Sequence, residues 1–333
     1  MIFERVKLSN FCSFRLGGLA KLFSIKSEDD LVNVIKQVQA AGLRTIVLGE
    51  GTNTFFADDL DNNLLILKME LKGVDAAKEK DFVYIKIKAG EIFDDIVKLS
   101  VKNNWWGIEN LSYIPGTVGA APVQNIGAYG VELKDVLEEV KAFDLFENKF
   151  KIFKNKDCNF SYRDSLFKKE KDRYIICELT LKLSKIRNPV LNYKSLNVLN
   201  KENVSVEEIR NEVIRIRKEK LPDYKEYPNC GSFFKNVIVT KEKLEELKIK
   251  YPNIPSFLEG DFVKIPTAWL IDNIAKMKGV RIGNVGTWPS QPLVLVNYGT
   301  ESAEEINNFE EEIRKKIFDE TGIIIEREVN FVK

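Results

Sequence analysis

Apolar side chains recur at steps of three and four residues in several segments, which is the spacing of one helix face. The clearest case lies between Ser27 and Gly42. Ser27 is a typical N-cap, Asp30 completes a capping box with it, and Gly42 suits the position after the last turn. Similar signals predict helices at residues 92–101, between Ser205 and Pro222, from Pro266 to Met277 before Gly279, and from Ser302 to Ile317.

Alternation of apolar and polar residues predicts strands that are buried on one face at residues 83–88 and 179–183. Strands are also expected at residues 45–48 and 323–332. Glu326 and Glu328 share one face of the last of these strands. A helix, the strand at 45–48 and a glycine turn follow one another, an order that indicates α/β structure. The helix that Pro222 must end marks a candidate domain boundary.

The composition is that of a folded globular protein. The chain has 333 residues, of which 44% are hydrophobic and 30% charged, with a mean hydropathy of −0.21. Single cores rarely grow past about 250 residues, so we expect two or three domains. The 51 basic and 50 acidic side chains leave a net charge of +1, so no global field attracts nucleic acid or an anionic membrane.

The chain contains no histidine, which removes the most common general base and zinc ligand. Any catalysis must therefore use other groups. The four cysteines, Cys12, Cys158, Cys177 and Cys230, are far apart and form no C-x-x-C pair, so we expect free thiols of a reducing compartment and no metal site. Charges interrupt the N-terminal segment, and no apolar run approaches the roughly 18 residues of a membrane span. We expect a cytoplasmic protein with no membrane or nucleic-acid partner.

Glycines punctuate residues 49–51, 115–119 and 127–130, where backbone can approach a ligand closely. The first segment superficially resembles a dinucleotide fingerprint, but Thr54 replaces the third glycine and the following residues open a helix poorly. A Rossmann site is therefore rejected. Each turn alone is best interpreted as an ordinary loop, whereas two turns separated by one α/β unit modestly favour a nucleotide site built from backbone N–H groups.

Two segments contain polar residues with alternative interpretations. Small and polar residues flank two aromatics at 229–236, which is odd for a core strand and typical of a ligand wall. Without histidine Ser232 cannot belong to a Ser-His-Asp triad, so a functional Ser232 would donate a proton; the alternative is a strand-end serine that satisfies the backbone. Arg163, in the Y-R-D-S run at 162–165, is either a functional cation or part of a surface ion pair.

Four segments together resemble one enzyme family. They are L-G-E-G-T-N at 48–53, I-P-G-T-V-G-A-A-P-V-Q-N-I-G-A-Y-G at 114–130, Y-R-D-S at 162–165 and G-S-F-F-K-N at 231–236. In this order, and over nearly the whole chain, they are similar to the UDP-N-acetylenolpyruvoylglucosamine reductases. The P-V-L-N-Y run at 189–193 resembles the substrate-covering loop of the type I subfamily.

The resemblance implies an α+β fold, with an FAD-binding region of the vanillyl-alcohol-oxidase (PCMH) type and a separate α+β substrate-binding domain. It implies FAD-binding subdomains at residues 1–69 and 70–217, the second joined by a terminal strand at 321–333, and a substrate-binding domain at 218–320. The implied reaction reduces UDP-N-acetylglucosamine-enolpyruvate to UDP-N-acetylmuramate in peptidoglycan synthesis. NADPH is the implied hydride donor, FAD is bound without a covalent link, and the enzyme is a monomer.

The resemblance also assigns site residues. Ser232 is the implied proton donor, and Arg163 and Glu328 polarise the substrate carboxylate. The implied cofactor-binding residues are Gly49, Glu50, Gly51, Thr52, Asn53, Pro115, Gly116, Thr117, Gly119, Asn125 and Gly127. The implied contacts to the UDP-sugar or NADPH are Tyr129, Tyr162, Tyr193, Arg217, Lys220, Asn236 and Gln291. No metal is implied.

Some positions depart from the usual pattern of the family. Thr52 stands where serine is common, and proline is frequent where this chain has Val237 and Arg327. Two alternatives remain open: another FAD-dependent oxidase or dehydrogenase of the same fold that acts on a small acid, and an inactive nucleotide-binding module. The joint presence of Arg163, Ser232 and Glu328 argues against the inactive module.

Overall fold

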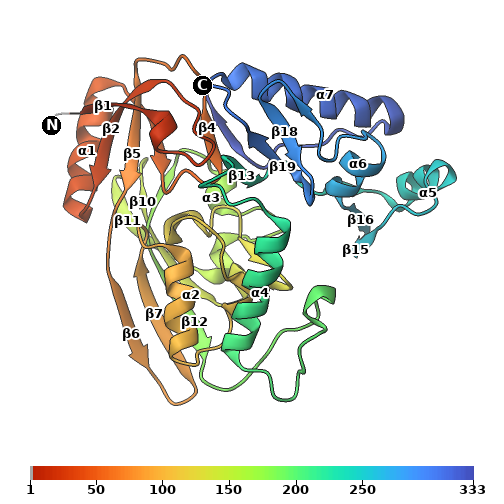
Figure 1. The fold of residues 1–333 in the computed structure, drawn as a ribbon. Coiled ribbons are helices and arrows are strands. Elements are labelled where there is room, and N and C mark those ends of the chain that lie inside the picture. Colours follow the sequence, from red (N-terminus) through yellow and green to blue (C-terminus); the bar gives the residue numbers. More distant parts are fainter. Residues whose placement is uncertain (1–2) are drawn as a thin grey trace. The chain divides into compact units, whose positions relative to one another are not determined.

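The computed structural model describes residues 3–333, and the first two residues of the charged N-terminal segment lie outside the described residues. The chain divides into two compact units (Figure 1). Unit 1 contains residues 3–6, 20–50 and 61–217. Unit 2 contains residues 7–19, 51–60 and 218–333. The assignment of separate FAD-binding and substrate-binding functions to parts of the chain stays a prediction.

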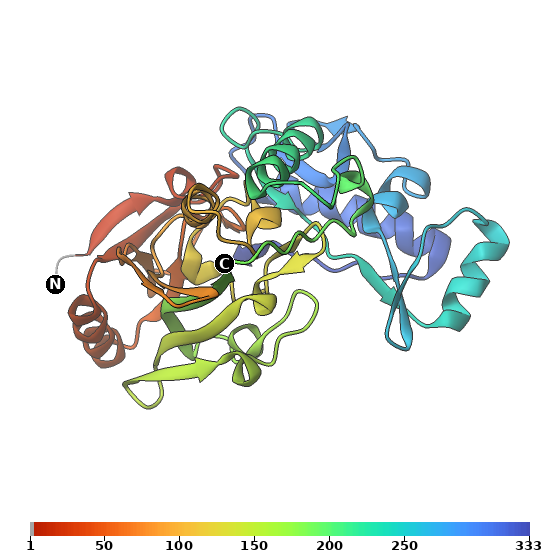
Figure 2. The ribbon, with the colours of Figure 1, turned by 90° about the horizontal axis from the view of Figure 1, so that it is seen from below.

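A four-stranded sheet in unit 1 has the order β1-β2-β5-β3, in which β2, β5 and β3 run parallel. Its strands are β1 (Glu4–Lys7), β2 (Leu19–Ile25), β3 (Arg44–Leu48) and β5 (Leu64–Met69). Helix α1 (Glu28–Ala41) lies on one face of this sheet in both views (Figures 1 and 2) and shares a core with β5. Ser27 and Asp30 form the capping box and Gly42 is left-handed at φ 63°, so the predicted helix is confirmed.

A second sheet of unit 1 is antiparallel along its length, with the order β11-β10-β12-β7-β6. Its strands are β6 (Val74–Lys78), β7 (Phe82–Lys88), β10 (Leu137–Asp144), β11 (Lys149–Lys154) and β12 (Tyr174–Ser184). Helix α2 (Phe93–Lys102) packs Phe93 and Val97 into the core of this sheet. Helix α4 (Val206–Lys220) starts at the predicted capping box and ends before Pro222. The strands expected at 83–88 and 179–183 are confirmed.

Shorter elements connect these layers. They include β8 (Gly127–Ala128), β9 (Val131–Glu132), α3 (Leu166–Lys169) and 3-10 helices at Glu109–Leu111, Val118–Ala120, Leu133–Asp135, Asn155–Cys158 and Lys194–Leu196. A further 3-10 helix at Leu8–Asn10 belongs to unit 2.

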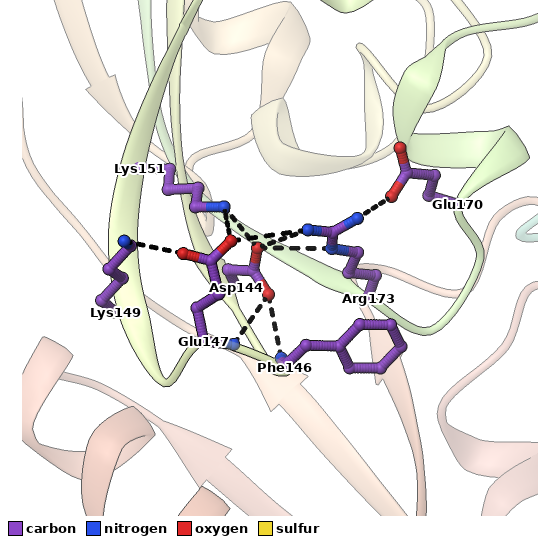
Figure 3. Close-up of polar contacts among 7 residues, drawn as sticks. All are labelled: Asp144, Phe146, Glu147, Lys149, Lys151, Glu170 and Arg173. Atoms are coloured by element: carbon purple, nitrogen blue, oxygen red, sulfur yellow. Dashed lines mark hydrogen bonds and ion pairs between the residues drawn. The ribbon is translucent and has the colours of Figure 1, made fainter.

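A buried carboxylate closes the β10–β11 hairpin (Figure 3). The side chain of Asp144 is 0% exposed and accepts from Lys151 at 2.8 Å and from Arg173 at 3.2 Å. Its Oδ1 also accepts from the backbone N–H groups of Phe146 and Glu147. Burial alone would raise the pKa of the Asp144 carboxyl, but these donors outweigh burial and hold that pKa well below its usual range.

Unit 2 contains three small sheets around one core. They have the orders β13-β19-β18-β17, β14-β16-β15 and β20-β4. The strands are β4 (Thr54–Phe56), β13 (Asn229–Ser232), β14 (Val237–Val239), β15 (Phe257–Glu259), β16 (Phe262–Ile265), β17 (Arg281–Ile282), β18 (Val285–Trp288), β19 (Gln291–Asn297) and β20 (Asn330–Val332). The helices are α5 (Lys241–Lys250), α6 (Thr267–Asn273) and α7 (Ala303–Thr321). Phe14, Phe55, Phe233 and Phe234 are buried at the centre of this core.

Two predicted elements differ from the structure. The helix expected from Pro266 to Met277 ends at Asn273, and the chain turns left-handed at Lys276, with φ 54°. The strand expected over 323–332 is regular only at β20. Ile323, Ile325 and Val329 are buried at alternating positions, yet only a single bridge, Phe234 to Arg327, pairs this stretch before β20. Alternation reports which residues are buried, and it does not supply a partner strand.

The four cysteines are free and buried. Within residues 3–333, no helix is long and apolar enough to cross a membrane. No group of three or more His, Cys, Asp or Glu side chains in the same residues could hold a metal ion.

Candidate functional site

Two of the predicted glycine turns meet within unit 1. A Cβ atom built on Gly49 would lie 2.3 Å from Thr117 Oγ1, a distance that no real side chain tolerates. The N–H of Gly116 donates to Glu50 Oε2 at 3.1 Å. A Cβ atom on Gly119 would likewise lie 2.6 Å from that of Ala89. The glycines therefore permit a close backbone approach that other residues would block.

The rest of the first turn belongs to unit 2. Gly51 is left-handed at φ 67°, and a Cβ atom there would lie 2.1 Å from the carbonyl oxygen of Phe11. The next residues, Thr52 and Asn53, are half-buried. Asn53 Nδ2 donates to the carbonyl oxygen of Glu328 at 3.4 Å. One end of the predicted cofactor turn is thus bonded to the segment that contains a predicted catalytic residue.

Lys68 supports the turn at Gly49, and sequence reasoning missed it. Its Nζ donates to the carbonyl oxygen of Gly49. Burial lowers the pKa of the Lys68 ammonium, while the charges of Glu70 and Glu50 oppose that shift. The available signal was a single lysine inside the otherwise apolar run of β5.

A second missed contact holds the segment before the proline-glycine turn. Arg210 on α4 forms a paired contact with Asp94 on α2, at 2.7 and 2.9 Å. Asp94 Oδ1 also accepts from the backbone N–H of Tyr113 at 2.6 Å. Burial would raise the pKa of Asp94, but the hydrogen bonds from Arg210 and Tyr113 lower it overall. This ion pair fixes the backbone two residues before Pro115.

Arg163 lies against the third glycine segment in unit 1. Its Nη2 donates to the carbonyl oxygen of Gly127 at 3.2 Å, and its guanidinium lies 5.6 Å from the ring centre of Tyr162. Asn125 is fully buried, and its Nδ2 donates to Glu132 Oε2 at 2.9 Å. The predicted residues 125, 127, 162 and 163 therefore belong to one region of unit 1.

Three predicted substrate contacts also come together in unit 1. The rings of Tyr129 and Tyr193 meet edge to face with centroids 5.3 Å apart. Arg217 Nε donates to the carbonyl oxygen of Tyr113 at 3.2 Å. Burial raises the pKa of the Tyr129 hydroxyl, and the neighbouring Arg217 opposes this rise. The same burial lowers the pKa of the Arg217 guanidinium. A cation and two phenols thus share one cluster, which suits a phosphate-bearing ligand.

Ser232 and Glu328 belong to adjacent segments of unit 2. Ser232 is exposed at the end of β13, and it lies between Gly231, at φ 70° with open space around it, and the buried Phe233. The N–H of Glu328 donates to the carbonyl oxygen of Phe233 at 2.8 Å. Two of the three predicted catalytic residues are therefore linked through one backbone hydrogen bond, while Arg163 lies in unit 1.

The remaining predicted contacts lie in unit 2 with different surroundings. Gln291 Oε1 is buried and has no hydrogen-bond partner among residues 3–333. Asn236 Oδ1 accepts from the N–H of Thr267 at 3.1 Å, at the start of α6. Lys220 is exposed at the end of α4. Of these three residues, Gln291 is therefore the best candidate to accept a hydrogen bond from a ligand.

Comparisons with known proteins show which class of protein the chain belongs to. Residues 20–145 match the family model of an FAD binding domain, and this stretch contains the turns that meet at Gly49 and Thr117. The chain is therefore an FAD-binding flavoprotein. Residues 223–332 match a second model, described as the C-terminal domain of UDP-N-acetylenolpyruvoylglucosamine reductase.

Relatives extend over nearly the full length. The chain is 40% identical to the UDP-N-acetylenolpyruvoylglucosamine reductase of Flavobacterium johnsoniae, over 98% of both chains. It is 37% identical to the enzyme of that name from Escherichia coli, covering 92% of this chain and 90% of the relative. The chain belongs to the UDP-N-acetylenolpyruvoylglucosamine reductase family. A crystal structure of such a reductase from Thermus caldophilus, 22% identical, covers 100% of both chains with a TM-score of 0.69 and supports the fold. The predicted fold class is confirmed.

The residues at the two turns fit FAD. Gly49 and Gly119 have no room for a Cβ atom because Thr117 and Ala89 pack against them, so the two turns can hold their backbones close together. Lys68 adds a positive charge beside the first turn, and a diphosphate carries negative charge. FAD is thus compatible with this chain's own residues, independently of the family match.

Proposed function

We propose that this protein reduces the enolpyruvyl group of UDP-N-acetylglucosamine-enolpyruvate to the lactyl ether of UDP-N-acetylmuramate, with NADPH as reductant. The observation that carries the proposal is the 40% identity to a reductase of this name over 98% of both chains. The product is a precursor of peptidoglycan, so the protein serves cell-wall synthesis, cell shape and division. It works as a monomer in the cytoplasm, a compartment that suits its four free thiols.

The residues that would hold FAD are those of the two turns, Gly49 to Asn53 and Pro115 to Gly119, supported by Asn125 and Gly127. When bound, FAD supplies the transfer of a hydride from NADPH to the substrate. Backbone N–H groups of the first turn are the natural partners of the diphosphate, because those of Gly116 and Gly119 in the second turn already donate to Glu50 and Ala89. Glu50 orders the second turn through its bond to Gly116.

Arg163 and Glu328 act on the substrate carboxylate. Addition of a hydride to the enolpyruvyl double bond places negative charge on the carbon beside that carboxylate. An enolate-like state of this kind is stabilised by a fixed cation in a site that excludes water. Arginine suits the role because it stays charged and grips a carboxylate at two points. The hydrogen bond from Arg163 to Gly127 fixes the guanidinium for this purpose.

Ser232 delivers the proton that completes the reaction. Its hydroxyl is exposed at the end of β13, and Gly231 leaves open space beside it for a substrate. A hydroxyl is a weak acid, so it protonates only a strongly basic carbon, and the enolate is such a species. Ser232 therefore needs no histidine to act.

The cluster of Tyr129, Tyr193 and Arg217 contacts the UDP diphosphate or NADPH. Its cation and phenol groups match phosphate oxygens. Tyr162, Lys220, Asn236 and Gln291 complete the ligand contacts. Gln291 is the best supported of these four, because its buried Oε1 has no hydrogen-bond donor among residues 3–333.

Ser232→Ala tests the proposed function. The variant should accept hydride from NADPH at the wild-type rate, yet form product about 10²- to 10⁴-fold more slowly, the usual cost of a lost general acid. Ser232→Cys should recover part of the rate, because a thiol also donates a proton. Rapid-mixing absorbance at the flavin band separates the two half-reactions.

The structural interpretation of Ser232 makes the opposite forecast. A serine that only satisfies backbone would lower the melting temperature of Ser232→Ala and leave turnover per folded molecule intact. Near-normal turnover would therefore remove Ser232 from the mechanism. Fast reoxidation by oxygen instead of by the UDP-sugar would favour an oxidase of the same fold.

A further inference from the structure

A half-buried arginine, with 21% of its side chain exposed, lies beside the proposed catalytic pair in unit 2. Arg327 precedes Glu328, and its Nη2 donates to Asn307 Oδ1 at 2.9 Å and to Glu310 Oε2. The carboxylate of Glu310 is buried at 2% exposure and also accepts from Arg314 Nε at 2.8 Å. Asn307 and Glu310 both belong to α7, so Arg327 is tied to a long helix.

Three aromatic rings surround the same guanidinium. The carbon Cζ of Arg327 lies 5.3 Å from the ring centre of Phe55, 5.5 Å from that of Phe233 and 5.2 Å from that of Phe331. Within residues 3–333, its buried Nε has no hydrogen-bond partner. The rings therefore hold this side of the guanidinium by cation–π attraction. We call Arg327, Glu310 and these three rings the arginine box.

The arginine box contacts both sides of the proposed catalytic pair. Phe233 directly follows Ser232, and Glu328 directly follows Arg327. The carbonyl oxygen of Phe233 accepts from the N–H of Glu328 at 2.8 Å. A displacement of Arg327 would therefore move the neighbours of Ser232 and of Glu328 together.

We infer that Arg327 is a positioning residue that sets Glu328 and Ser232 for protonation of the substrate. This inference rests on the proposed function, which assigns those two residues to the reaction. Backbone bonds at Glu326 and Glu328 hold the chain on either side of position 327, and the side chain of Arg327 adds a third attachment, to α7.

The test replaces Arg327 and measures each half-reaction separately. In Arg327→Met, reduction of the flavin by NADPH should keep its wild-type rate. Transfer to the UDP-sugar should slow by about 10- to 100-fold, the effect of a small misplacement of catalytic groups. Arg327→Lys keeps the charge without the planar fork and should recover only part of the rate. If Arg327→Met fails to fold, the double variant Arg327→Met with Glu310→Met also removes the buried carboxylate that would lose this partner, and it keeps the proposal testable.

Arg314→Met is the matched control. It also removes a cation from Glu310, together with a bond to the carbonyl oxygen of Ile325 in the same segment, but it leaves the side chain next to Glu328 in place. It should lower the melting temperature as Arg327→Met does, with a normal second half-reaction. An equal loss of that half-reaction in both variants would show that stability and not position is responsible, and this result would overturn the inference.

Glu328→Gln separates failure of the inference from failure of the proposed function. If Glu328→Gln slows transfer to the UDP-sugar while Arg327→Met does not, the site stands and the inference about Arg327 is wrong. If Glu328→Gln leaves that transfer unchanged, the assignment of Glu328 itself is wrong. Slow transfer in both variants, with normal flavin reduction, supports both.

Discussion

Three of the ten non-glycine residues with left-handed backbone in the described part of the chain are proposed to bind ligands. Asn125, Tyr129 and Arg163 have φ values of 45°, 50° and 53°. Asparagine tolerates this region, but for tyrosine and arginine it costs about 1–3 kcal/mol and persists only where the surroundings enforce it. Asn110 Nδ2 donates to the carbonyl oxygen of Tyr129, and Lys168 Nζ donates to that of Arg163. These bonds hold the strained backbone that aims both side chains.

Tyr193→Phe should raise KM for the UDP-sugar about 10-fold with little change in kcat. Phenylalanine keeps the ring that meets Tyr129 at 5.3 Å and loses only the hydroxyl. A hydrogen bond to a charged group contributes about 1.5–3 kcal/mol, and ground-state binding appears in KM. Steady-state kinetics give both constants. Tyr251→Phe, which removes a hydroxyl bonded to Glu320 in unit 2, is the control and should change neither. An unchanged KM for Tyr193→Phe would argue against the diphosphate contact.

At the scale of elements, pattern predicts local structure where the signals agree. Helix α1 has an apolar stripe, a capping box and a terminal glycine, and it forms as predicted. The stretch from Ile323 to Arg327 has the period of a strand but lacks a continuous partner, which only tertiary structure decides. For the same reason the roles of Lys68 and Arg327 could not be predicted, because their partners lie far away in the sequence. The glycine turns could be predicted from the sequence, whereas the contact of Gly49 with Thr117 could not.

Asp144→Asn should destabilise the β10–β11 hairpin in a pH-dependent way. The folded state lowers the pKa of this carboxyl, so its stabilisation is full above the unfolded pKa of about 3.9 and fades as pH falls below it. The melting temperature of the variant should therefore lie below that of the wild type at pH 7. The difference should shrink between about pH 4 and pH 2. Glu139→Gln, which breaks the exposed ion pair with Lys154 on the same hairpin, should cost little. A difference that is constant with pH would contradict the charge argument.

At the scale of the molecule, the chain passes from unit 1 to unit 2 within the predicted cofactor turn. Glu50 belongs to unit 1 and Gly51 to unit 2, and a further passage follows Arg217. A resemblance read from the sequence places functional domains along the chain, but it does not predict which short segments pack with which core. Residues 7–19 and 51–60 illustrate this, because they pack with residues 218–333 far along the chain.

FAD should be bound tightly but without a covalent link. The chain has no histidine, and its four cysteines are buried. Acid precipitation should therefore release the yellow colour into the supernatant, where its absorbance near ~450 nm can be measured. Flavin that stays with the pellet would overturn this prediction. A boiled sample without acid serves as the control for trapping of free flavin.

The four buried thiols can report on transient local opening of each unit. Cys158 and Cys177 belong to unit 1, and Cys12 and Cys230 belong to unit 2. Burial raises the pKa of each thiol, so an alkylating reagent reacts only when a unit opens and the thiolate forms. Peptide mass spectrometry would give the rate at which each cysteine is alkylated. These rates measure how often each unit opens in the unmodified wild-type chain. Added FAD binds the closed form, so it should slow the labelling of the cysteines in the unit that contains its site.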